Sequence, residues 1–271
     1  MNTDRNAPIG VFDSGVGGLT VVREIMRNLP HERIVYFGDT ARVPYGSKSK
    51  STVLRYSRQI VRFLETQNVK AIVAACNTAS ALALETIEKE VPLPIRGVVN
   101  PGAPVAVHTT RNKRVGVIAT ESTIHSHLYR TLIQAEDPEI TVFGKACPLF
   151  VPLVEEGWTK DSITREVAGR YLGELLEKDI DTLIMGCTHY PLLRSLLREI
   201  VGEKVTLVNP AYETAQALKR MLSDMNLENQ APGGEPYRFY TSDAAEKFDA
   251  FAASILPCRV PAAEQIPIEE Y

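Results

Sequence analysis

The sequence of 271 residues has little of several features that mark particular protein classes. It contains four cysteines, none in a C-x-x-C pair and none with a histidine at zinc-ligand spacing, so we expect no metal site. Its longest uncharged apolar-rich stretch, residues 71–84, is shorter than the ~18 residues that a membrane span needs. The first residues lack the basic-then-apolar pattern of a signal peptide. We therefore expect a cytoplasmic protein with no membrane partner.

The net charge of the chain is close to zero, at -3. Thirty Lys and Arg residues stand against 33 Asp and Glu residues, and basic residues are not interleaved with aromatic ones. Because nucleic acids and membrane surfaces are bound by basic patches, we expect neither as a partner. Two nucleotide motifs are also missing. A G-x-G-x-x-G fingerprint would need glycine where Thr20 stands, and the loop at 46–49 lacks the upstream glycine of a P-loop.

What the chain does contain is an alternation of short apolar runs, rich in β-branched residues, with segments of helical periodicity. Runs of about four to six residues, each followed by apolar residues three or four apart, are typical of a parallel α/β sheet. The strands predicted in the first half are residues 9–12, 33–38, 71–76 and 95–100. At this length, and with 44% apolar residues, the chain can bury one large core or two small ones.

The strand pattern then starts again. The stretches 114–120, 139–144, 181–189 and 207–210 resemble 8–14, 32–38, 70–78 and 98–101, in the same order and at offsets between 106 and 111 residues. Four ordered matches at a nearly constant offset indicate a duplicated unit. We therefore predict two pseudo-symmetric α/β domains with central, mainly parallel sheets and an active site in the cleft between them. The chain after Pro210 has no counterpart in the repeat. We expect it to pack onto the first domain, which gives bounds of 1–98 plus 210–271 and of 99–209.

Two cysteines occupy matching places in the two copies. Cys76 ends an apolar run in "ACNTAS", and Cys187 ends another in "GCTHYP", 111 residues downstream. In parallel sheets, ligands bind at the carboxyl ends of the strands, where the following helices present free N–H groups and a partial positive charge. We expect Thr78 to cap the first of these helices and Pro191 to lie in the first turn of the second. Such a position stabilises a thiolate, although a buried core cysteine is the alternative.

Other polar residues stand near the same strand ends. His189 follows Cys187 by two residues and is a candidate proton carrier, with a structural histidine as the alternative. Asp13 follows the first strand and is a candidate to hold an ammonium group. Hydroxyl and amide side chains that could bind a carboxylate on the matched edges are Ser14, Asn77, Thr78, Thr120 and Thr188.

Two cysteines that face each other across a cleft suit a symmetric proton transfer. A hydrolase needs one nucleophile and a base, and a thiol–disulfide enzyme would keep its cysteines close in sequence. In a racemisation, one thiolate removes the Cα proton and the opposite thiol protonates the other face of the carbanion. A racemase is therefore the leading hypothesis. A binding module for an acidic ligand or a protein, without catalysis, and a thiol redox protein are the alternatives.

The motifs "GVFDSGVGGLTV", "YFGDTARVPYG", "ACNTA", "LVEEG" and "GCTHYP", in order from residue 8 to about 210, resemble the motif set of the bacterial glutamate racemases. The resemblance implies a cofactor-independent isomerase that interconverts L- and D-glutamate, without pyridoxal phosphate or metal, and supplies D-glutamate for peptidoglycan. A racemase for aspartate or another amino acid is the alternative within this class. Members of the family are often dimers, so a homodimer is also implied.

The resemblance also assigns roles to single residues. It implies that Cys76 and Cys187 are the acid/base pair and that Asp13, Glu155 and His189 assist them. Glu156, the neighbour of Glu155, is the alternative helper acid. The substrate-binding residues that it implies are Asp13, Ser14, Pro44, Tyr45, Gly46, Asn77, Thr78, Thr188 and His189.

Overall fold

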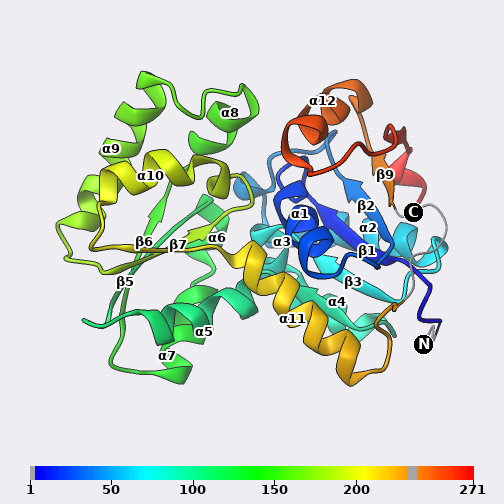
Figure 1. The fold of residues 1–271 in the computed structure, drawn as a ribbon, viewed down its shortest axis with the longest axis horizontal. Coiled ribbons are helices and arrows are strands. Elements are labelled where there is room, and N and C mark those ends of the chain that lie inside the picture. The colour runs from blue at the N-terminus through cyan, green and yellow to red at the C-terminus, as the bar shows by residue number, and fades with distance from the viewer. Residues whose placement is uncertain (1–3, 231–236) are drawn as a thin grey trace.

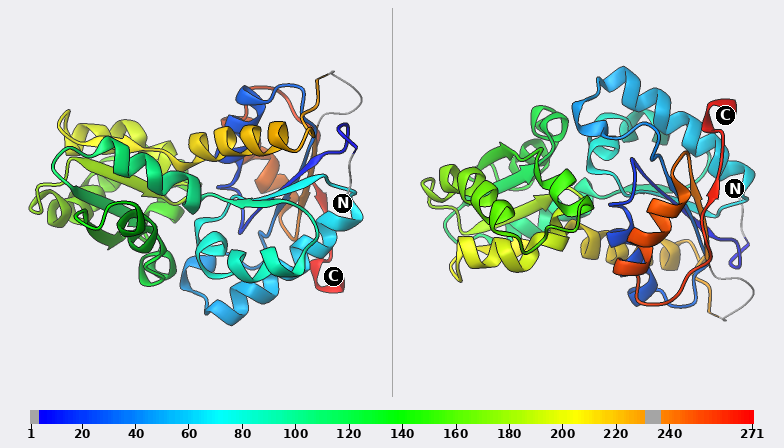
Figure 2. Two further views of the ribbon diagram at one scale, coloured as in Figure 1. Left: turned by 90° about the horizontal axis from the view of Figure 1, so that it is seen from below. Right: turned by 90° about the horizontal axis from the view of Figure 1, so that it is seen from above.

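The computed structural model describes residues 4–230 and 237–271 and contains two separate parallel β-sheets, one in each half of the view in Figure 1. Views from below and above show two lobes, each made of one sheet with helices on its faces (Figure 2). Every helix in the described ranges is too short or too polar to cross a membrane.

The first sheet has six strands in the order β10-β9-β2-β1-β3-β4, and all its pairings are parallel. Its strands are β1 (Ile9–Asp13), β2 (Ile34–Gly38), β3 (Ala71–Ala74), β4 (Ile95–Gly97), β9 (Tyr237–Thr241) and β10 (Glu264–Gln265). The last two come from the end of the chain, where β9 pairs with β2. Every residue of β1, β2 and β3 is buried, which is why these strands read as continuous apolar runs.

The second sheet has four parallel strands in the order β6-β5-β7-β8. They are β5 (Arg114–Ala119), β6 (Thr141–Ala146), β7 (Thr182–Gly186) and β8 (Thr206–Val208). This order repeats the order β2-β1-β3-β4 of the first sheet, with each strand replaced by the one that the sequence repeat matches to it. The predicted fold class, two duplicated α/β units with parallel sheets, is therefore confirmed.

Helices connect the strands and cover both sheets. The α-helices are α1 (Leu19–Asn28), α2 (Lys50–Thr66), α3 (Asn77–Leu82), α4 (Leu84–Glu90), α5 (Val99–Thr109), α6 (Glu121–His125), α7 (Leu128–Glu136), α8 (Phe150–Glu155), α9 (Ser162–Leu176), α10 (Arg194–Val201), α11 (Pro210–Asp224) and α12 (Ala245–Ile255). Three 3₁₀ turns are η1 (Tyr45–Ser47), η2 (Tyr190–Leu193) and η3 (Ile268–Glu270).

Two predicted strands were too long. The strand expected at 71–76 ends at Ala74. The strand expected at 95–100 ends at Gly97, and α5 begins at Val99. Pro101 explains this second difference, because proline has no N–H for a sheet and its fixed φ suits the first turn of a helix.

The two lobes are joined through α5 and α11. The chain passes from the first sheet to the second through α5 and returns through α11, and these two helices pack against each other where the lobes meet (Figure 1). Helix α11 also packs on α1 of the first lobe. The residue bounds proposed above for the two domains stay a prediction.

Candidate active site

The carboxyl ends of the two sheets face each other where the lobes meet. Helix α3 and the turn η1, which follow strands of the first sheet, both contact α6, which follows β5 of the second. Cys76 stands after β3 and Cys187 after β7, and both side chains are nearly buried, with 5% and 6% of their surface exposed. The sequence repeat therefore places two thiols on opposite sides of one junction.

Cys76 caps α3. Its backbone is extended, and its Sγ accepts the N–H of Ala79 at 3.4 Å and lies 3.7 Å from Oγ of Ser14. The cap predicted at Thr78 was wrong, because the chain already turns into the helix after Cys76, and Thr78 lies inside the first turn. Burial, and then the carboxylate of Asp13, raise the pKa of Cys76 to about 12. Cys76 is therefore a neutral thiol at neutral pH.

The thiol of Cys187 is the first of three polar side chains that contact one another in a row. Its Sγ lies 3.8 Å from Nδ1 of His189, and Nε2 of His189 donates to Oε1 of Glu155 at 3.0 Å. His189 is the N-cap of η2, with Pro191 in the first turn as expected, and Glu155 ends α8. Glu156, the alternative helper acid, is exposed. The arrangement joins a thiol, an imidazole and a carboxylate.

The pKa of the His189 imidazole is raised, which favours its protonated form. Burial alone would lower the pKa of His189, but its hydrogen bonds to Cys187 and Glu155 and the nearby carboxylate of Asp13 outweigh it and raise the pKa to about 10. Glu155 responds in the opposite sense. Burial works to raise its pKa, but His189 and then Lys247 outweigh burial and lower it. The sulfur of Cys187 therefore lies beside a cation, whereas the sulfur of Cys76 lies beside an anion.

Asp13 ends β1 and is fully buried. One carboxylate oxygen accepts the N–H of Gly15 at 3.0 Å, and the other has no partner among the described residues. Burial raises the pKa of Asp13, against the charge of His189 and the N–H groups of the following turn, which lower it. Asp13 thus lies close enough to act electrostatically on both Cys76 and His189. The predicted contact of Asp13 with an ammonium group stays a prediction.

The glycine-rich turn after β1 lies against the opposite lobe. A Cβ at Gly17 would lie 2.4 Å from Oγ1 of Thr188 and 2.5 Å from the ring of His189. In the following helix, Oγ1 of Thr20 donates to the backbone oxygen of Thr188 at 2.9 Å. Glycine is required at residue 17 because the backbone approaches the Thr188–His189 pair too closely for any side chain. The turn therefore packs the first lobe against Thr188 and His189, the two residues that follow Cys187.

Hydroxyl and amide groups from both lobes gather on the other side of the junction. Thr78 Oγ1 lies 2.9 Å from Thr120 Oγ1, and Thr120 Oγ1 lies 2.9 Å from Thr123 Oγ1. Tyr129 donates its hydroxyl to Oδ1 of Asn77 at 2.8 Å. Thr123 and Tyr129 were missed by the sequence analysis, because each lies inside or after a short helix and nothing in the sequence marks it.

The predicted residues Pro44, Tyr45 and Gly46 lie in the loop after β2, next to α6. Gly46 packs against Thr120, and its backbone oxygen accepts the hydroxyl of Ser122 at 2.8 Å. The Tyr45 side chain is buried, and its hydroxyl donates to the carboxylate of Asp39. It therefore serves to hold the loop, and Asp39 is a structural partner that the sequence analysis missed. Its place directly after a strand, as for Asp13, was the available signal.

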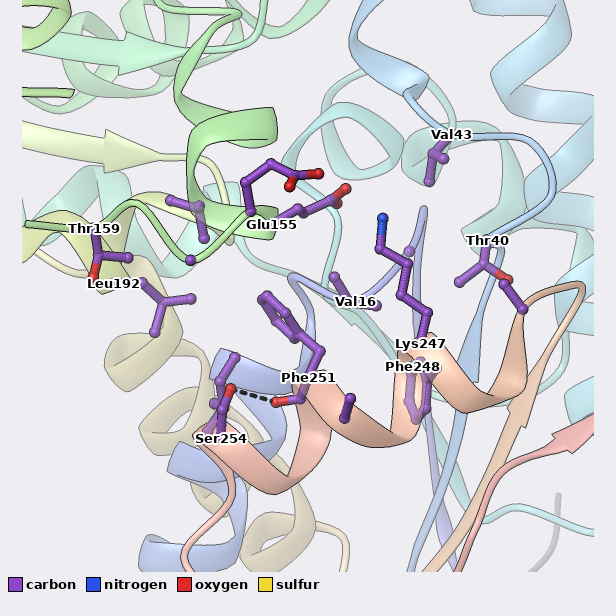
Figure 3. Close-up of a pocket in the computed structure, with 17 residues that line it drawn as sticks. Val16, Thr40, Val43, Glu155, Thr159, Leu192, Lys247, Phe248, Phe251 and Ser254 are labelled. Atoms are coloured by element: carbon purple, nitrogen blue, oxygen red, sulfur yellow. Dashed lines mark hydrogen bonds between the residues drawn. The ribbon is translucent and has the colours of Figure 1, made fainter. Parts of the chain in front are cut away.

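A cavity of about 700 Å³ lies between the end of α8, the turn after β1 and α12 (Figure 3). Gly15, Val16, Glu155 and Lys247 are among the described residues that line it, and neither cysteine is. Phe251 of α12 lies in this cavity and packs near His189, with ring centroids 6.4 Å apart. The cavity thus borders the carboxylate end of the Cys187–His189–Glu155 chain. Within the described ranges, His, Cys, Asp and Glu side chains form no group of three or more that could hold a metal.

Comparisons with known proteins agree on one family. The family model described as Asp/Glu/Hydantoin racemase matches residues 9–218. A glutamate racemase of Geobacter metallireducens is 49% identical over 89% of each chain, and one of Syntrophus aciditrophicus is 46% identical over 98% of this chain and 99% of its own.

Solved structures give the same result. A glutamate racemase isoform of Bacillus anthracis superposes with a TM-score of 0.93 at 37% identity, covering 97% of this chain and 98% of that one. A glutamate racemase of Francisella tularensis in complex with D-glutamate superposes with a TM-score of 0.92 at 38% identity, covering 98% and 100%. An aspartate racemase of Picrophilus torridus, at 17% identity and a TM-score of 0.57, shares the fold alone.

Proposed function

Because this chain belongs to the Asp/Glu/hydantoin racemase family, we propose that it is a glutamate racemase, which interconverts L- and D-glutamate by proton transfer at Cα. The observation that carries the proposal is the pair of matched thiols, Cys76 and Cys187, at facing strand ends with opposite electrostatic surroundings. A racemase needs an acid on one face of Cα and a base on the other, and this asymmetry provides both.

In one direction of the proposed reaction, Cys187 acts as the base. The imidazolium of His189, held by Glu155, is the counter-ion for its thiolate. The thiolate takes the proton from Cα, and the C–H electron pair remains as a planar carbanion conjugated with the α-carboxylate. Cys76, whose raised pKa keeps it a thiol, then gives its proton to the opposite face. The product has inverted configuration, and Cys76 is left as thiolate, ready for the reverse reaction.

Glutamate also needs donors for its carboxylates and an acceptor for its ammonium group. We assign the carboxylates to the hydroxyls and amides at the junction and to the backbone N–H groups beside them. These residues are Ser14, Tyr45, Gly46, Asn77, Thr78, Thr120, Thr188 and His189, and Pro44, which has no N–H to donate, is assigned to shaping the loop that carries Tyr45 and Gly46. Those on the two sides of the junction now bind one another, as Thr78 binds Thr120, so the substrate would exchange these hydrogen bonds for its own. We assign the ammonium group to Asp13, whose charge also assists the thiols.

Glutamate is favoured over aspartate by the relatives. Curated relatives named glutamate racemase share 44–49% of their residues with this chain, whereas the aspartate racemase of Picrophilus torridus shares 17%. The proposal includes a role in peptidoglycan synthesis through D-glutamate, a location in the cytoplasm and a homodimer. Cell fractionation tests the location, and light scattering of the purified protein tests the dimer.

The decisive experiment is to incubate purified protein with L-glutamate, without added cofactor, and to follow optical rotation or circular dichroism. The signal should decay to zero from either enantiomer, because the two forms have equal free energy. Retained optical activity with L-glutamate and its loss with L-aspartate would assign the protein to the alternative substrate. If solutions of both L-glutamate and L-aspartate kept their optical activity, the racemase proposal would be overturned.

A further inference from the structure

Lys247 brings a positive charge to the cavity that Glu155 borders. It lies on α12, and its side chain rises from that helix across the cavity toward the end of α8, where Glu155 lies (Figure 3). Among the described residues that line the cavity, the charged side chains are Glu155, Glu156 and Lys247, so Lys247 is the one cation. It forms no ion pair within the described ranges, and its charge therefore acts across the cavity.

Glu155 is the group on which this charge acts. One of its oxygens accepts from His189, and the carboxylate also borders the cavity, with 25% of its side chain exposed against 6% for His189. A carboxylate in this place is open to water on one side and holds a buried imidazolium on the other. Its ionised form keeps His189 protonated and aimed at Cys187. A protonated Glu155 would offer His189 a much weaker acceptor.

We propose that Lys247 is a positioning residue for the racemisation proposed above: its ammonium group, across the cavity, keeps Glu155 ionised against His189 and so holds the imidazole beside Cys187. The inference rests on that proposed function. It concerns a helix, α12, that lies beyond the residues 9–218 matched by the family model. It also gives the end of the chain, which has no counterpart in the repeat, a part in the chemistry of the second lobe.

The charged and titratable groups that face the Glu155–His189 pair come from four elements. Glu156 follows Glu155 at the end of α8, Asp13 ends β1, Cys187 follows β7 and Lys247 lies on α12. Asp13 and Glu156 carry the same charge as Glu155, so neither favours its ionisation. Of these groups, Lys247 is the one outside the pair that lowers the pKa of Glu155. Removing its charge must therefore raise that pKa.

The test removes the charge of Lys247 in one variant and keeps it in another, without disturbing the fold. Lys247 is exposed, so Lys247→Met and Lys247→Arg should both fold, and Lys219→Met removes the same charge from an exposed place on α11, away from the cavity. In Lys247→Met, the acid limb of the pH profile of kcat/KM should move up by about half a pH unit. On the acid limb itself, below the pKa of Glu155, kcat/KM should fall by up to about threefold, and above about pH 6, where Glu155 is ionised in both proteins, it should hardly change. Lys247→Arg and Lys219→Met should match the unmodified protein.

A second readout does not depend on turnover. The ring resonances of His189 in the unliganded protein, assigned by comparison with His189→Gln, should show an acid-side transition that reports Glu155. This transition should move to higher pH in Lys247→Met and stay in place in Lys247→Arg. An unmoved transition together with an unmoved kcat/KM profile would overturn the positioning role. If the protein failed to racemise glutamate, the proposed function would fall, and the resonance shift would still decide whether Lys247 acts on Glu155.

Discussion

The hydroxyl oxygens of Thr78 and Thr120 lie 2.9 Å apart, although the two residues follow strands of different sheets. Thr78 lies in the first turn of α3 and Thr120 caps α6. Their contact, extended by the hydrogen bond from Ser122 to the backbone oxygen of Gly46, joins the two lobes at the edge where we place a carboxylate of the substrate. The distance between the lobes at this point therefore determines whether both sides reach the same ligand.

Gly46→Ala should separate the lobes at this edge. The added Cβ would lie 2.6 Å from Cβ of Thr120, so one of the two segments must shift. We expect KM for glutamate to rise on the order of tenfold, with a smaller change in kcat. The substitution alters the edge that binds the substrate and leaves the two thiols in place. Steady-state kinetics in both directions measure this. Gly169→Ala, at an exposed helical glycine with open space around it, is the matched control and should keep wild-type kinetics.

The two thiols should be separable by isotope exchange. Cys76→Ala and Cys187→Ala should each lose racemisation by at least about a thousandfold, because one face of Cα is left without a proton carrier. In deuterated water, each variant should still exchange the Cα hydrogen of one enantiomer, and the two variants should exchange opposite enantiomers. Proton NMR of the Cα signal measures this. Cys258→Ala, which removes an exposed cysteine, should behave as wild type. Racemisation by either single variant would contradict the two-base scheme.

The sequence was sufficient to place the two thiols, and the physical reason is the duplication. A parallel sheet brings the carboxyl ends of its strands to one edge, so two matched strand ends predicted that Cys76 and Cys187 would lie at equivalent places. Asp13 and Thr120 could be placed by the same argument. None of this needed a side-chain conformation.

The pairings within the site could not be predicted in that way. Glu155 and Glu156 are adjacent, and a helical residue points about 100° away from its neighbour. Which of them reaches His189 therefore depends on how α8 packs, which the sequence pattern does not show. The hydroxyl of Tyr45 turns to Asp39 for a similar reason, because a buried phenol needs a partner and the nearest one is in its own loop. Lys247 lies in a segment outside the repeat, so no internal match pointed to the cavity.

The stability of the protein should depend on pH through His189. Its pKa is raised from 6.5 to about 10 in the folded chain, so the stability that its protonated form contributes is fully present below about pH 6.5. That contribution is lost as the pH rises through about 10. Thermal melting of the wild type and of His189→Gln should therefore differ most near pH 6 and converge by about pH 10 to 11. The raised pKa of Cys76 also destabilises the fold at alkaline pH, but it does so in both proteins and cancels in the comparison. A constant difference across this range would mean that His189 is not charged in the folded state.

Loss of the His189 imidazole or of the Glu155 carboxylate should lower kcat/KM. The loss should be equal for L-glutamate and D-glutamate as substrates. L- and D-glutamate have equal free energy, so the ratio of kcat/KM in the two directions must stay at one in any variant. We expect kcat/KM to fall by about a hundredfold in His189→Asn, the lower end of the range for acid–base assistance. In Glu155→Gln it should fall by about tenfold, because the amide still accepts a hydrogen bond but carries no charge.

The asymmetry between the thiols should then appear in kcat and KM separately. His189 lies 3.8 Å from the sulfur of Cys187, whereas the sulfur of Cys76 has Ser14 and the N–H of Ala79 as its neighbours. In His189→Asn, kcat should therefore fall more in the direction that starts with Cys187 as the base, with a compensating change in KM. Full progress curves from each enantiomer give both constants, and the exchange experiment with the cysteine variants identifies the direction. Equal losses of kcat in both directions would mean that His189 acts on the bound substrate as a whole and not on one thiol.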